Sequence, residues 1–125
     1  MKKIIFAPCL ALLFFCCKQK QAFESCSPAA FEKLLQKEAS IQLVDVRRPD
    51  EFAAGHINDA LPINVEDADF IAKADSLLDK ARPVAVYCRS GVRSKKAAKQ
   101  LARKGYKVYE LNNGYKGWME YKGKQ

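Results

Sequence analysis

The sequence lacks the cysteine patterns that build disulfide frameworks or structural metal sites. No C-x-x-C pair occurs among its five cysteines, which are Cys9, Cys16, Cys17, Cys26 and Cys88. It also lacks internal repeats, low-complexity tracts and basic runs interleaved with aromatic residues. These absences argue against a repeat architecture and against nucleic-acid binding. We therefore expect no bound metal ion and no nucleic-acid partner.

No apolar run is long enough to cross a bilayer comfortably. The run Ile4–Phe15 covers 12 residues, follows a positive start and ends at Cys16 and Cys17. Its length suits the core of a signal peptide, but no A-x-A-like cleavage site follows it. The segment resembles a bacterial lipoprotein signal, in which the cysteine after the cut carries lipid. We predict a signal peptide over residues 1–16 and lipid on Cys17; lipid on Cys16, an uncleaved anchor and an ordinary secretory signal are the alternatives.

This interpretation of the N-terminus predicts a location and a partner. A lipid-bearing Cys17 would hold the protein to a membrane on the periplasmic side of a bacterial cell envelope. Residues 17–27 would then form a tether, with Cys26 inside it. A Cys26–Cys88 disulfide is the less favoured alternative to two free thiols, because a tether cysteine is not fixed opposite Cys88.

The composition suits one compact domain, which we expect to be a monomer. The chain has 125 residues, 49% of them hydrophobic, and a formal net charge of +8. This length fits a single domain, and this hydrophobic content argues against disorder. The positive balance is compatible with acidic substrates.

Strand and helix patterns alternate along the chain. This alternation predicts an α/β domain with a central parallel sheet and helices on both faces. Ser27 and Pro28 have the residue types of a helix start, and Gly105 that of a helix end. The expected helices cover residues 27–39, 48–54, 66–79, 92–104 and a short segment around Trp118, and the expected strands cover residues 41–46, 60–63, 83–88 and 106–111.

The chemistry is expected where the strand 83–88 ends in Cys88. Ligands of open α/β sheets bind at the carboxyl ends of the strands. The next residues read RSGVR and lead into a basic helix, whose first turn offers unsatisfied N–H donors. Gly91 lets the backbone turn, and Arg89 and Arg93 add positive charge. Such a cradle stabilises a thiolate, so we expect a lowered pKa for Cys88.

Three ordered motifs carry a resemblance to a known family. The segments LVDVRRPDEFAAGHI, VAVYCRSGVRS and LNNGYKGW resemble rhodanese-like sulfurtransferases over residues 28–122. The resemblance implies a three-layer α/β fold and a Cys88 that carries sulfane sulfur as a persulfide. It also implies an active loop, with Asp45 and Arg47 as a supporting polar pair. The loop residues, which would bind the substrate, are Arg89, Ser90, Gly91, Val92 and Arg93.

The implied reaction needs no metal and no organic cofactor. Thiosulfate or a related small anion would donate sulfur to Cys88, and a thiol or cyanide would accept it, with ping-pong kinetics. Two turns depart from the family pattern: Asn58 and Asp59 replace a Pro-Gly pair, and Asn113 replaces a glycine. We expect Asp59 and Asn113 to tolerate the left-handed geometry that glycine would adopt.

Two other functions remain open at this stage. One is a non-catalytic persulfide carrier or binding module. The other is a cysteine-dependent phosphatase or arsenate reductase, whose loop has five residues between cysteine and arginine; here four residues separate Cys88 from Arg93, which suits a single sulfur better than a phosphate. We interpret His56 as structural and Trp118 as a core residue.

Overall fold

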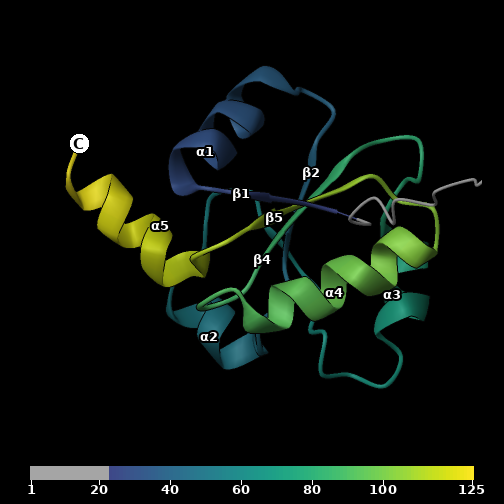
Figure 1. Cartoon of the computed structure of the whole chain (residues 1–125). Helices are drawn as coiled ribbons and strands as arrows, with labels where there is room; N and C mark the ends of the chain where they lie inside the picture. The colour runs from purple at the N-terminus through teal and green to yellow at the C-terminus, as the bar shows by residue number, and fades with distance from the viewer. Residues whose placement is uncertain (1–22) are drawn as a thin grey trace, which may run out of the picture.

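The structure, a computed structural model, describes residues 23–125 and contains a five-stranded sheet flanked by helices (Figure 1). The strands are β1 (Glu24–Cys26), β2 (Gln42–Asp45), β3 (Leu61–Pro62), β4 (Val84–Tyr87) and β5 (Val108–Leu111). The helices are α1 (Pro28–Lys37), α2 (Pro49–Ala54), α3 (Phe70–Leu77), α4 (Val92–Arg103) and α5 (Gly114–Gly123).

The sheet is parallel throughout and has the strand order β1-β5-β4-β2-β3. Strand β4 lies in the middle, and all four of its residues are buried. Parallel strands covered on both faces need such a continuous apolar run. The predicted fold class, a central parallel sheet in an α/β domain, is confirmed.

Different helices cover the two faces of the sheet. Val84 and Val86 of β4 pack into one core cluster, and Ala85 and Tyr87 pack into the other, as the two-residue period of a strand requires. Residues of α3 and α4 complete the first cluster, and residues of α1 and α5 complete the second. Figure 1 shows α1 and α4 on opposite sides of the sheet. The molecule therefore has three layers.

The start of the described chain differs from the sequence prediction. Residues 24–26, expected in a tether, form β1 and pair with Tyr109–Leu111 of β5. Cys26 is buried in the core cluster of α1 and α5, which ties this segment to the sheet. Cys26 and Cys88 are both free thiols, so the alternative of a disulfide between them is wrong.

The other N-terminal predictions lie outside the described residues. They concern the signal peptide over residues 1–16, the lipid on Cys17 and the tether up to residue 22. Within residues 23–125, no helix has both the length and the apolar character needed to cross a membrane.

The helix predicted over residues 66–79 is shorter in the structure. It begins at Phe70, because the preceding acidic residues form turns: Asn64 Oδ1 accepts from the Glu66 N–H at 3.0 Å, and the Phe70 N–H donates to the Asp67 carbonyl at 3.0 Å. Asn and Asp favour such local turns over a helix interior. At the other end of the chain, the helix start at Ser27 is confirmed, since its Oγ accepts from the Ala30 N–H at 3.2 Å.

Candidate active site

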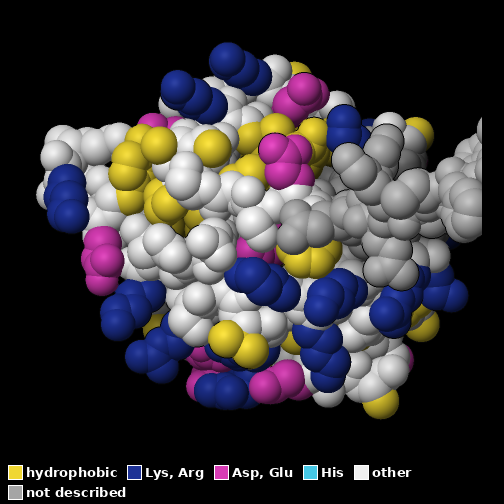
Figure 2. Space-filling view, in the orientation of Figure 1, with side chains coloured by type: hydrophobic (Ala, Val, Ile, Leu, Met, Phe, Trp, Pro, Cys, Tyr) yellow, Lys and Arg dark blue, Asp and Glu magenta, His cyan; other side chains and the backbone are white. Residues whose placement is uncertain are grey.

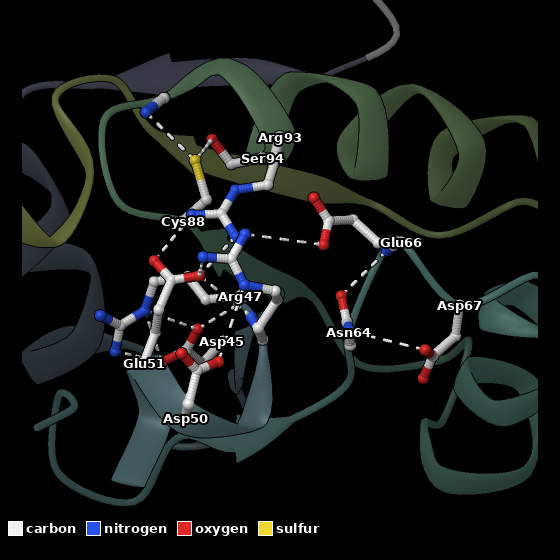
Figure 3. Close-up of polar contacts among 12 residues, drawn as sticks. Asp45, Arg47, Asp50, Glu51, Asn64, Glu66, Asp67, Cys88, Arg93 and Ser94 are labelled. Atoms are coloured by element: carbon white, nitrogen blue, oxygen red, sulfur yellow. Dashed lines mark hydrogen bonds and ion pairs between the residues drawn. The ribbon is translucent and has the colours of Figure 1, made fainter. Parts of the chain in front are cut away.

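Cys88 lies directly after β4 and before α4, at the carboxyl edge of the sheet. Its sulfur accepts a hydrogen bond from the Gly91 N–H at 3.1 Å, and its thiol donates to Ser94 Oγ at 3.4 Å (Figure 3). The side chain has no exposed surface. The sulfur is therefore held by amide and hydroxyl groups and is shielded from solvent.

The acidity of Cys88 follows from these contacts. Burial raises the pKa of the Cys88 thiol, but hydrogen bonds from the Ser94 side chain and from the N–H groups of Ser94, Gly91 and Ser90 outweigh it. The pKa therefore lies below its ordinary value, as the sequence predicted. A thiolate is both the nucleophilic form of cysteine and the form these donors stabilise.

The turn between β5 and α5 holds the cysteine loop in place. The Tyr115 N–H donates to the Cys88 carbonyl at 2.8 Å, and the Lys116 N–H donates to the Arg89 carbonyl at 3.0 Å. Gly114 has a φ of +61°, and a Cβ there would collide with the backbone of Arg89. Gly91 has a φ of +102°, and a Cβ there would collide with the Asn112 carbonyl. Both glycines are thus required by close backbone packing.

The two loop arginines have different surroundings. Arg93 forms a two-pronged ion pair with Glu51 of α2, at 2.6 and 2.8 Å. The hydrogen bond from Arg93 lowers the pKa of Glu51 to about 2. Arg89 is exposed and lines a cavity of about 240 Å³, together with Arg47, Glu51 and Tyr115. Arg89 thus faces an opening beside the loop, whereas Arg93 already has an anionic partner.

Ser90 and Val92 complete the loop and are exposed; 77% of the Val92 surface is accessible. The predicted loop residues therefore occupy one short turn around Cys88. Their backbone N–H groups face the sulfur at Ser90 and Gly91.

Asp45 and Arg47 form a buried ion pair at the end of β2. Arg47 Nη2 lies 2.7 Å from Asp45 Oδ2 and 2.6 Å from the Gly55 carbonyl. The guanidinium also lies over the Tyr115 ring, with Cζ 4.4 Å from the ring centroid. Because the Tyr115 N–H binds the Cys88 carbonyl, the pair contacts the residue that holds the loop and not the loop itself.

His56 and Trp118 lie in structural surroundings, as interpreted from the sequence. His56 is exposed, hydrogen-bonds the Phe52 carbonyl through Nδ1 at 3.0 Å and stacks on the Phe52 ring. Trp118 is buried and packs edge-on against Phe31. Asp59 adopts a φ of +64°, which confirms the expected left-handed turn. Asn113 has a φ of −95°, so that expectation was wrong there, and Gly114 takes the positive φ instead.

The sequence did not point to three polar residues around the site. These are Glu51, Glu110 and Lys95, which pairs with Glu110. Glu110 is buried in β5, where it contacts Ser94 and Lys95. The sequence did offer one signal for Glu110, because it is a charged residue inside the otherwise apolar strand β5. Among residues 23–125, no cluster of His, Cys, Asp and Glu could hold a metal ion.

Comparisons with known proteins identify similar chains. Residues 27–121 match the family model described as Rhodanese-like domain. The chain is 41% identical over 83 residues to Thiosulfate sulfurtransferase GlpE of Shewanella oneidensis, covering 65% of this chain and 78% of that one. It is 39% identical over 98 residues to Thiosulfate sulfurtransferase GlpE of Pseudomonas aeruginosa, covering 77% and 84%. A solved Rhodanese-like Domain Protein from Staphylococcus aureus has a TM-score of 0.68 at 27% identity, covering 77% of this chain and 91% of that chain.

Proposed function

The chain belongs to the rhodanese-like domain family and is a rhodanese-type sulfurtransferase, and on this premise we propose that it moves sulfane sulfur from thiosulfate to a thiol through a persulfide on Cys88. The observation that carries the proposal is the environment of the sulfur. Amide and hydroxyl donors surround Cys88 Sγ at the start of α4 and lower its pKa.

The reaction divides into two exchanges at one sulfur atom. In the first, the Cys88 thiolate attacks the outer sulfur of thiosulfate, the S–S bond of thiosulfate breaks, and sulfite leaves with the bonding electrons. In the second, an acceptor thiolate attacks the outer sulfur of the Cys88 persulfide. The acceptor leaves as a persulfide, and Cys88 returns as a thiolate. Cyanide in the acceptor's place leaves as thiocyanate.

The surrounding residues have distinct parts in this scheme. The N–H groups of the loop would hold the anionic outer sulfur of the persulfide, because they already point to the cysteine. Arg89, at the cavity, would bind the anionic end of thiosulfate, and Arg93 would join it once its pairing with Glu51 loosens. Asp45 and Arg47 would keep the loop in place through Tyr115.

The decisive measurement is the intact mass of the protein after exposure to thiosulfate. We expect a gain of about 32 Da, confined to Cys88, and its loss on addition of cyanide or a thiol. Cys88→Ser should abolish both the mass gain and thiocyanate formation while leaving the fold intact. Cys26→Ser, which removes the other described thiol, is the matched control and should load normally.

Comparing the loading of sulfur on Cys88 with the rate of its release distinguishes the proposed enzyme from a persulfide carrier. A persulfide carrier would gain the same mass but release sulfur slowly to free thiols or cyanide. Because the Cys88 side chain has no exposed surface, slow release of sulfur to free acceptors is a specific alternative that the rate of thiocyanate formation tests. Sulfur transfer by the Cys88→Ser variant would refute the persulfide route itself.

We further propose that the protein is a lipoprotein of a bacterial cell envelope, held to the membrane through Cys17. The apolar run Ile4–Phe15 and the cysteines that follow it support this proposal. The domain itself is expected to act as a monomer.

A further inference from the structure

Glu110 is a fully buried carboxylate close to the reactive cysteine, and the proposed exchange of sulfur does not use it. It lies in β5 and has no exposed surface. Its Oε2 accepts from Ser94 Oγ at 3.3 Å, and the same hydroxyl lies 3.4 Å from Cys88 Sγ. Burying a carboxylate is costly unless it is paired, and this pairing leads directly to the sulfur.

The Ser94 hydroxyl has one proton and two possible acceptors. A serine hydroxyl donates one hydrogen bond and accepts others. While Cys88 is a neutral thiol, its S–H donates to Ser94 Oγ, and the hydroxyl proton is directed to Glu110. Once Cys88 is a thiolate, the sulfur also needs a donor. The thiolate and the carboxylate then compete for the same proton.

Lys95 keeps the Glu110 carboxylate paired if the Ser94 hydroxyl turns its proton toward the sulfur. Its Nζ lies 3.2 and 3.3 Å from the two carboxylate oxygens, and Ser25 Oγ donates to Oε1 at 3.3 Å. Lys95 also donates to the Gly91 carbonyl at 3.2 Å, so it links Glu110 to the cysteine loop. If the Ser94 hydroxyl turns to the sulfur, Glu110 keeps two donors.

The titratable groups around Glu110 and Cys88 come from three elements, α4, β1 and α2. Lys95 of α4 faces Glu110. Cys26 of β1 packs on the other face of the sheet, but the Glu110 charge still raises its pKa, as a smaller cause after burial and Glu24. Arg93 of α4, paired with Glu51 of α2, acts electrostatically on Cys88. Within the described residues, Lys95 is the one cation that hydrogen-bonds Glu110.

We propose that Glu110 is a positioning residue that acts through Ser94: it holds the Ser94 hydroxyl while the Cys88 sulfur is neutral and yields it when the sulfur is anionic. The sulfur is an anion when it attacks the sulfur donor and again when the acceptor removes the outer sulfur. Glu110 thereby limits how strongly the hydroxyl favours the thiolate. The inference rests on the proposed function for its place in turnover, but its test needs no sulfur donor.

The test is a double-mutant cycle on the pH profile of Cys88 alkylation. Iodoacetamide modifies the full chain at a series of pH values, and mass spectrometry of the Cys88 peptide excludes the other cysteines. Glu110→Gln keeps the shape and removes the charge, so the midpoint should fall by roughly half to one pH unit. Ser94→Ala removes the donor and should raise the midpoint. Glu120→Gln, an exposed change in α5, is the control and should leave it unmoved.

The cycle decides whether Glu110 acts through Ser94 or only as a distant charge. In the Ser94→Ala background, Glu110→Gln should move the midpoint by less than half of its effect in the wild-type background. A shift of half or more, an upward shift or no shift in the wild-type background would overturn the inference. If circular dichroism shows that Glu110→Gln does not fold, Lys95→Met replaces it in the cycle. The alkylation midpoint should then rise in the wild-type background, and in the Ser94→Ala background it should rise by less than half as much. Failure of sulfur loading would be seen separately, by the mass measurement.

Discussion

The guanidinium of Arg93 is occupied by a carboxylate of the same chain. Glu51 accepts from both of its terminal nitrogens at 2.6 and 2.8 Å, and both side chains are largely shielded from solvent. A thiosulfate ion that uses Arg93 must therefore compete with Glu51 for the same N–H donors. Single substitutions of Glu51 and Arg93 can therefore test this competition through the KM for thiosulfate.

Glu51→Gln should strengthen the binding of thiosulfate. The neutral amide competes less well for the guanidinium, so we expect the KM for thiosulfate to fall by about threefold, with a loss of stability below about 1 kcal/mol. Arg93→Ala should raise KM by about tenfold, because it removes the donor itself. Steady-state kinetics at varied thiosulfate concentration checks both values.

Arg103→Ala is the matched control, because Arg103 is an exposed arginine at the far end of the same helix. It should change neither KM nor kcat appreciably. Unchanged kinetics in both the Glu51 and Arg93 variants would remove Arg93 from the donor site and leave Arg89 as the anion-binding side chain.

At the residue scale, the sequence could predict what lies on one continuous segment. Cys88, Gly91 and Arg93 are neighbours in the chain, so their order alone could predict that a loop surrounds the cysteine. Glu51 and Glu110 are far from that segment in sequence, separated from Arg93 by 42 positions and from Ser94 by 16. Only the fold brings them to the loop, and no local pattern specifies such a pairing.

At the element scale, the central strands and long helices were predictable because their apolar periods are strong. The failures were short segments. Strand β1 has three residues and only one of them, Cys26, is buried, so its sequence shows no alternation. Its place depends on pairing with β5, which is a tertiary contact. The start of α3 failed for the opposite reason, since local turns involving Asn64 and Asp67 override the helical pattern.

The packing of the turn between β5 and α5 against the cysteine loop yields an element-scale prediction. Gly114→Ala should impair both stability and sulfur transfer, because alanine is disfavoured at a φ of +61° and its Cβ would displace the backbone of Arg89 and Ser90. We expect a loss of about 2 kcal/mol or more in the free energy of unfolding by urea, with a marked fall in kcat.

Gly123→Ala provides the comparison for that change. Gly123 ends the same helix, and apart from its chain neighbours and the backbone of its own helix, nothing lies within 4 Å of the position its Cβ would take. Stability and activity should therefore stay close to the wild type. Equal effects of the two substitutions would mean that the turn does not fix the loop.

At the scale of the whole molecule, positive charge is concentrated along helix α4. Helix α4 begins at the cysteine loop and carries no acidic residue; its basic residues are Arg93, Lys95, Lys96, Lys99 and Arg103. Figure 2 shows Lys and Arg side chains gathered on the face of the molecule that α4 occupies in Figure 1. Such a field raises the local concentration of small anions, in keeping with an anionic sulfur donor.

The proposed membrane attachment makes a prediction about the whole protein that is independent of the site. If Cys17 carries lipid, the full chain produced in a bacterium should partition into the detergent phase of a Triton X-114 extract, because each buried methylene of an acyl chain contributes about 0.8 kcal/mol to membrane affinity. Cys17→Ser should move the protein to the aqueous phase with its sulfur transfer intact, since the residues of the site lie later in the chain, between Asp45 and Lys116. Cys16→Ser is the control and should remain with the detergent. Detergent partitioning that survives Cys17→Ser but not Cys16→Ser would assign the lipid to Cys16, and partitioning that survives both would favour an uncleaved anchor.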